Sequence, residues 1–131
     1  MKRLARAFAA GLLLAGPAAA DPATGLWQTE PGDDGAFAHV RIYSCAPHLC
    51  GVIEAAFDRA GAPVESDTVG KRMIWDMRPE GGGGYGGGKI WAPDRDKVYR
   101  AQMALQGNRL TVEGCILGGL ACRGQDWTRL R

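Results

Sequence analysis

The chain has 131 residues, of which 46% are hydrophobic and 23% charged, with 20 glycines, four cysteines and a formal net charge of +2. The positive charge is concentrated at the start, where Lys2, Arg3 and Arg6 precede an apolar run over residues 7–15. Without these three cations the remaining chain has one more acidic than basic side chain. That balance removes the compositional reason to expect binding to nucleic acid.

The N-terminus has the order of a secretory signal peptide. A basic head and a short apolar stretch are followed by the helix breakers Gly16 and Pro17, and then by small residues before a cut after Ala20. The apolar run is shorter than the about 20 residues that cross a bilayer. We therefore expect residues 1–20 to be removed on export. Residues 21–131 should form one domain that has no transmembrane segment.

The rest of the chain predicts an all-β domain. Short apolar or alternating runs lie between clusters of Gly, Pro, Asp and Asn, and no window favours a long helix. Their regular spacing indicates a small antiparallel up-and-down β-barrel of about eight strands that closes on itself. The strands are expected at Leu26–Thr29, Phe37–Cys45, Leu49–Phe57, Lys71–Met77, Gly88–Trp91, Val98–Gln106, Arg109–Cys115 and Gln125–Leu130.

Four cysteines in an exported chain indicate two disulfides. We expect Cys45 to bond to Cys50, and Cys115 to bond to Cys122, so that each bridge staples the end of a hairpin from outside. The spacings do not fit paired zinc knuckles, and an oxidising compartment disfavours thiolate ligands. The sequence therefore predicts no metal site.

The cysteines and turn residues also predict two strand registers. If Cys45 lies opposite Cys50, the apolar Ile42 faces Ile53 on one side of the hairpin. On the other side Arg41 faces an acid, Glu54.

The second hairpin turns at Gly107-Asn108, a pair suited to a two-residue turn. Its register sets Leu105 against Leu110 and Met103 against Val112. One face of this hairpin is then apolar and the other polar, as a barrel wall requires.

These registers predict which side chains point into the barrel. The inward set is Val40, Ile42, Ile53, Phe57, Tyr99, Met103, Leu105, Leu110, Val112 and Trp127. Two interpretations of the interior remain open: a filled core, or a slot for an apolar ligand. If a slot exists, the residues expected to line it are Tyr99, Met103, Trp127, Phe57 and Ile53.

The segment Gly81–Lys89 contains seven glycines and matches two phosphate-loop patterns. Ile90 stands where a phosphate loop needs a hydroxyl, and no helix follows to bind a pyrophosphate. A glycine run of this kind is typical of a flexible loop. We interpret Gly81–Gly88 as a mobile lip beside the mouth of the barrel.

Three stretches carry a family resemblance, at residues 21–53, 87–99 and 110–129. The last has the most specific pattern, L-x-V-x-G-C-I-L-G-G-L-x-C-x-x-Q-x-W-T-R. Together they resemble the bacterial family described as domain of unknown function 2147. The resemblance implies export in Gram-negative bacteria and a calycin-like, or lipocalin-like, small barrel. It brings no established activity and no catalytic residues.

The two ends of the domain also resemble the closure of a lipocalin barrel. Gly25-x-Trp27 lies near the start and Arg129 near the end. The resemblance implies that the first-strand Trp packs under the last-strand Arg in a cation–π contact.

Our functional expectation is a periplasmic β-barrel that binds a small apolar or amphipathic molecule. The alternative is an envelope scaffold or protein-interaction domain with a filled barrel and no ligand. No nucleophile–base pair is visible in the sequence, so we expect neither an enzyme nor a cofactor.

Overall fold

The computed structural model describes residues 20–131, and all but the last residue of the predicted signal peptide lie outside that range. The strand bounds are β1 Gly25–Gln28, β2 Phe37–Cys45, β3 His48–Phe57, β4 Pro63–Val64, β5 Arg72–Gly81, β6 Gly84–Ala92, β7 Lys97–Gln106, β8 Arg109–Ile116 and β9 Ala121–Arg129. A short 3-10 segment, η1, spans Leu117–Gly119. Within the described range no helix is long and apolar enough to cross a membrane.

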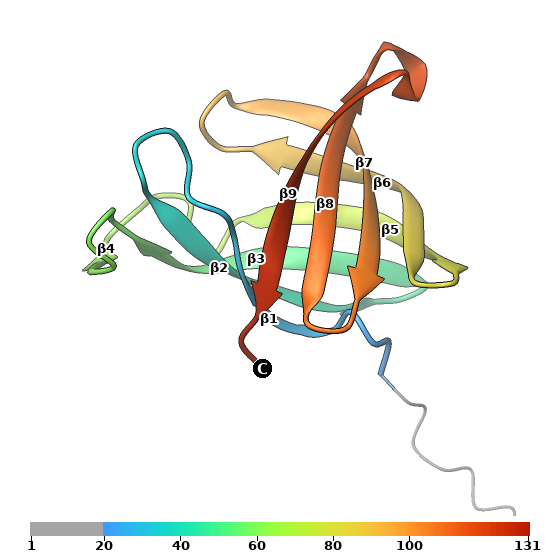
Figure 1. The fold of residues 1–131 in the computed structure, drawn as a ribbon, viewed down its shortest axis with the longest axis horizontal. Helices are drawn as coiled ribbons and strands as arrows, with labels where there is room; N and C mark the ends of the chain where they lie inside the picture. Colours follow the sequence, from blue (N-terminus) through green and yellow to red (C-terminus); the bar gives the residue numbers. More distant parts are fainter. Residues whose placement is uncertain (1–19) are drawn as a thin grey trace, which may run out of the picture.

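The strands form a closed antiparallel barrel (Figure 1). Eight strands follow one another in the order β2-β1-β9-β8-β7-β6-β5-β3, and β2 pairs with β3 to complete the ring. The two-residue β4 adds to one end of β3. The predicted small all-β barrel of about eight strands is therefore confirmed, and so are both predicted disulfides.

The β7–β8 hairpin has the predicted register. Met103 pairs with Val112 and Leu105 with Leu110, on either side of the two-residue turn at Gly107-Asn108. Such a turn leaves only one way for the flanking strands to pair. The register continues into β9, where Leu110 pairs with Trp127.

The predicted register of the β2–β3 hairpin is wrong by two residues. Cys45 pairs with His48 across a two-residue turn, and Ile42 pairs with Gly51 instead of Ile53. A Cβ at Gly51 would lie 3.1 Å from the Ile42 Cδ1 atom and 3.3 Å from the Ile74 Cβ atom, so a side chain there would require these neighbours to shift. The predicted disulfide survives because Cys45 reaches Cys50 diagonally, with 5.8 Å between their Cα atoms.

A bulge at Glu54 then reverses the faces of the last part of β3. Val40 pairs with Ile53, but the preceding His39 pairs with Ala55, so Glu54 is left over. Glu54 turns outward, where the Arg41 Nε donates a hydrogen bond of 2.7 Å to its carboxylate. The expected ion pair is present, although the two residues are not directly opposite.

The glycine-rich segment is part of the sheet, so its interpretation as a mobile lip is wrong. β5 continues to Gly81 and β6 begins at Gly84, which leaves Gly82-Gly83 as the turn. Gly83 has a φ of +81° and its carbonyl accepts a hydrogen bond from the Leu105 amide at 2.7 Å. A Cβ at Gly83, Gly86, Gly87 or Gly88 would come within 3.0 Å of a neighbouring atom, so these four glycines allow close approach of the neighbouring chain.

Gly88 supplies a test of that packing role. A Cβ at Gly88 would lie 2.9 Å from the Met77 Cε atom and 3.0 Å from the Trp75 carbonyl oxygen. We expect Gly88→Ala to lower the free energy of unfolding by about 1–3 kcal/mol through overpacking, measured by urea denaturation. Gly84→Ala is the matched control, since its nearest neighbour would be 3.4 Å away. Equal effects of the two substitutions would contradict this account.

Candidate functional site

The interior of the barrel is filled by its own side chains. Trp27 and Trp127 have 0% and 1% of their surface exposed, and they belong to one continuous apolar cluster. Three of the residues expected to line a ligand slot are members of that cluster, namely Ile53, Met103 and Trp127. The Trp127 indole N–H is satisfied within the protein, since it donates to the Gln125 side-chain oxygen at 3.0 Å. These residues therefore pack as core.

The other two expected lining residues lie elsewhere. Tyr99 is half-buried on β7, paired with Ile90, and packs against the backbone position of Gly114. Phe57 does not point inward, because the bulge at Glu54 places it on the same face as its partner Phe37. Its ring stacks on that of Phe37 with 5.1 Å between the centroids. The prediction that Phe57 points inward is therefore wrong, and no local sequence pattern marks the bulge that reorients it.

His39 completes the cluster around Phe57, with 4.4 Å between the two ring centroids. Its Nε2 lies 3.2 Å from the side-chain oxygen of Gln28 on β1. Burial lowers the pKa of His39 below its usual value, and the nearby Glu54 carboxylate opposes that shift. The neutral imidazole therefore belongs to an outer aromatic patch that ties β1, β2 and β3 together.

One end of the barrel is sealed by Trp27 and Arg129, which the structure brings together. The guanidinium carbon of Arg129 lies 4.4 Å from the centroid of the Trp27 ring. The same guanidinium donates hydrogen bonds to the carbonyl oxygens of Thr24, at 2.9 Å, and Pro22, at 2.5 Å. A Cβ on Gly25 would come within 2.5 Å of the Arg131 carbonyl oxygen, which explains the glycine two residues before the Trp. The cation thus satisfies its donors while it covers the ring.

A second contact at this end was not predicted from the sequence. The buried Tyr85 donates its hydroxyl hydrogen to the Asp21 carboxylate at 2.6 Å. Burial, together with the hydrogen bond to Asp21 and its negative charge, raises the pKa of Tyr85 well above its usual value. Asp21 also accepts a hydrogen bond from the Ala23 amide at 2.8 Å. The phenol stays protonated and anchors the first residues of the domain to β6.

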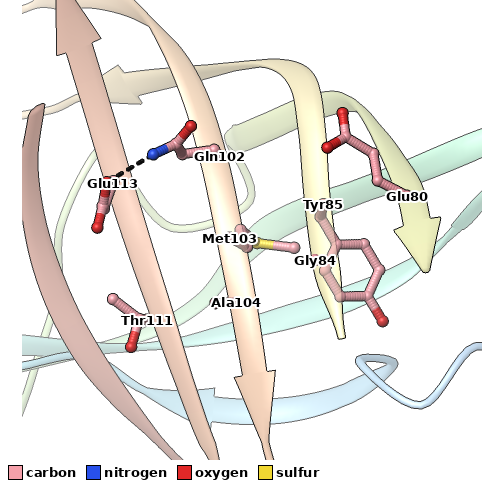
Figure 2. Close-up of a pocket in the computed structure, with 8 residues that line it drawn as sticks. All are labelled: Glu80, Gly84, Tyr85, Gln102, Met103, Ala104, Thr111 and Glu113. Carbon is pink, nitrogen blue, oxygen red and sulfur yellow. Dashed lines mark hydrogen bonds between the residues drawn. The ribbon is translucent and has the colours of Figure 1, made fainter. Parts of the chain in front are cut away.

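Two pockets in the described part of the chain are open to solvent. One, of about 200 Å³, lies over β6, β7 and β8, where Gln102 donates a 2.7 Å hydrogen bond to Glu113 (Figure 2). Its floor includes the small residues Gly84 and Ala104. The other pocket lies beside β3 and β4. The first has the polar side chains to hold a small group, and Tyr85 and Met103 of the core cluster also line it.

The disulfides leave no thiol for metal binding in the described chain. The Glu113 carboxylate and the sulfurs of Cys115 and Cys122 lie within 4.8 Å of one another. The two sulfurs are bonded to each other, so neither can act as a thiolate ligand.

The fold and these sites can now be compared with known proteins. A family model described as "Uncharacterized protein conserved in bacteria (DUF2147)" matches residues 25–129. The chain belongs to this family. The DUF2147 chain is also similar to the solved structure of protein HP1028 from the human pathogen Helicobacter pylori, described as belonging to the lipocalin family. The TM-score is 0.68, with 18% identity over 82% of each chain, which establishes a shared lipocalin-like barrel fold. No curated protein matches the sequence.

A double-mutant cycle tests whether Trp27 and Arg129 seal the barrel. We expect Trp27→Phe and Arg129→Met each to lower the unfolding free energy, and the double variant to lower it by less than their sum. The coupling should be about 1–2 kcal/mol, because the contact is shielded from water. Arg72 over Trp75, with 5.5 Å to the ring centroid, is the exposed control pair. Strict additivity for Trp27 and Arg129 would mean that their contact does not stabilise the fold.

Proposed function

We propose that this DUF2147 protein is an exported envelope protein that binds its partner on the outside of a filled barrel. The barrel is then a rigid scaffold, and the protein acts by binding rather than by catalysis. The observation that carries the proposal is the packed interior. Trp27 and Trp127 have 0% and 1% of their surface exposed and belong to one continuous apolar cluster.

The sequence predicted that the inner face of the barrel is apolar, and a filled interior agrees with that prediction. The side chains that a carrier would use to contact an apolar ligand already contact one another. Close packing of this kind resists insertion of further volume, because protein cores are as dense as organic crystals. Binding is then left to loops and outer faces, where an interaction requires no rearrangement of the core.

The proposed compartment is the periplasm of a Gram-negative bacterium. Two disulfides and a leader pattern support export, since disulfides persist in oxidising compartments. The contacts of Asp21 with Tyr85 and Ala23 also support a mature chain that begins at residue 21. A cut after Ala20 would keep every one of these contacts.

Carriage of a small apolar or amphipathic molecule is the second candidate function. The lipocalin-like fold favours it, because barrels of this size can hold one small ligand. The residues that would contact the molecule are Ile53, Met103 and Trp127, and they would have to move apart to make room for it.

The substitution Met103→Trp distinguishes a filled scaffold from a ligand carrier. If the barrel is filled, Met103→Trp lowers the unfolding free energy by about 1–3 kcal/mol through overpacking. The fluorescent apolar probe N-phenylnaphthylamine should then show no saturable binding to either protein. Ala104→Trp is the control, because Ala104 is the outward neighbour of Met103 on the same strand. Saturable probe binding that Met103→Trp abolishes without loss of stability would overturn the scaffold and favour the carrier.

Export has its own test. We expect the protein recovered from a periplasmic extract to begin at Asp21, as measured by intact mass and N-terminal sequencing. A large charged residue at the third position before the cut should block processing, so Ala18→Lys should retain the leader. A different N-terminus, or full-length protein that remains in the cytoplasm, would refute the proposal.

A further inference from the structure

The connection between β8 and β9 presents bare apolar side chains to solvent. We define the tip as Ile116, Leu117 and Leu120, which have 51%, 71% and 90% of their surface exposed. The loop that carries the tip projects beyond the other strand connections at the top of Figure 1, at the opposite end from the β7–β8 turn. Leu120 is the most exposed of the large apolar side chains in the described part of the chain. Scattered single apolar residues are ordinary on a surface, but three within five positions of one loop need an explanation.

The structure holds this loop in a defined shape. The Cys115–Cys122 disulfide closes its base, and the Leu120 amide donates a hydrogen bond of 3.3 Å to the Leu117 carbonyl. Leu117 itself has a φ of +55°, a conformation that a leucine rarely adopts. The backbone therefore fixes the leucines in an outward position instead of letting them fold back onto the barrel.

The residues next to the tip are cationic. Arg100 pairs with Cys115 on one side of the loop base, and Arg123 pairs with Gly114 on the other. Lys97 begins β7, and Val98 beside it is 53% exposed. Residues 97–101 and 114–123 together contain no acidic side chain.

The acids of the adjoining β6–β7 turn already have partners. The Asp96 carboxylate accepts a 2.9 Å hydrogen bond from the Trp91 indole, and Asp94 lies 3.9 Å from the Arg95 guanidinium. The nearest acid on the β8 side, Glu113, is bonded to Gln102. The tip therefore combines exposed apolar side chains with the flanking cations Lys97, Arg100 and Arg123, and the Glu113 carboxylate lies within 4.8 Å of the disulfide at its base.

We propose that this tip inserts into the surface of an anionic lipid bilayer and docks the protein there. Apolar side chains bury in the boundary between headgroups and acyl chains, while the cations at the base contact lipid phosphates. A narrow projecting loop suits this role better than it suits a protein partner. A stable protein interface buries about 800 Å² on each side, which calls for a broad face and not three side chains at a point.

This inference rests on the proposed function. If the filled barrel binds its partner on the outside, the tip is the part of the outer surface that makes the contact. The two can fail separately. Binding to vesicles depends on the tip and its cations, whereas the Met103 and probe measurements depend on the interior.

Co-sedimentation with vesicles tests the proposal, using exported, oxidised protein from which the leader has been removed. We expect the protein to bind vesicles made of equal parts phosphatidylglycerol and phosphatidylcholine, and to bind pure phosphatidylcholine much more weakly. Leu120→Ser should reduce the partition coefficient about tenfold or more, since it removes one buried leucine side chain. Val69→Ser is the matched control, because Val69 is exposed and lies outside the tip.

The cations give an independent measurement. Arg100→Gln and Arg123→Gln should each weaken binding to the anionic vesicles about fivefold, with no effect on neutral ones. A Leu117→Trp variant should in addition show fluorescence quenching by acyl-chain-brominated lipid beyond that of the unsubstituted protein. All these side chains are at the surface, so urea denaturation should find the variants as stable as the parent.

Three outcomes would overturn the proposal. The first is recovery of the protein in the supernatant with anionic vesicles. The second is equal binding by Leu120→Ser and Val69→Ser. The third is a Leu117→Trp variant whose fluorescence is not quenched. Equal binding of the two serine variants, or absence of quenching, would mean that the tip does not enter the bilayer. The tip would then be a surface for a protein partner or have no role in membrane binding.

Discussion

Closure of this barrel depends on the cation–π contact between the Arg129 guanidinium and the Trp27 ring. β1 has only four residues and pairs with β9 at just two positions, Trp27 with Arg129 and Gln28 with Thr128. A ladder this short leaves the first strand close to a free edge, which water and other strands can attack. The Arg129 guanidinium compensates for this short ladder. It covers the Trp27 ring and donates hydrogen bonds to two carbonyl oxygens in residues 22–24.

The same end of the barrel collects the parts of the chain that are farthest apart in sequence. The Trp27 indole donates to the Ala23 carbonyl at 2.9 Å, so the segment before β1 is held against the core. Asp21 then reaches Tyr85 on β6 through a hydrogen bond to a protonated phenol. The first and last residues of the domain thus form a plug over one end of the core.

A filled and plugged barrel moves the functional question to the outside. The outer surface offers the polar pocket over β6–β8, the aromatic patch of Phe37, His39 and Phe57, and the apolar tip beyond β8. Of these three features, the tip combines the highest exposure with a closed loop and flanking cations. Its place at the end opposite the plug lets the protein touch a surface without disturbing the contacts that close the barrel.

The sequence by itself determined the features that depend on neighbouring residues. Alternation revealed the all-β class, the Gly107-Asn108 turn set the β7–β8 register, and the short cysteine spacings determined both disulfides. Tertiary structure alone decided features that depend on strands distant in sequence. Gly51 faces Ile42 because Ile74 packs at the same point, and the bulge at Glu54 turns Phe57 outward. Gly88 is a glycine of β6 because Met77 approaches it from β5, and no local pattern records the size of a neighbour that arrives from another strand.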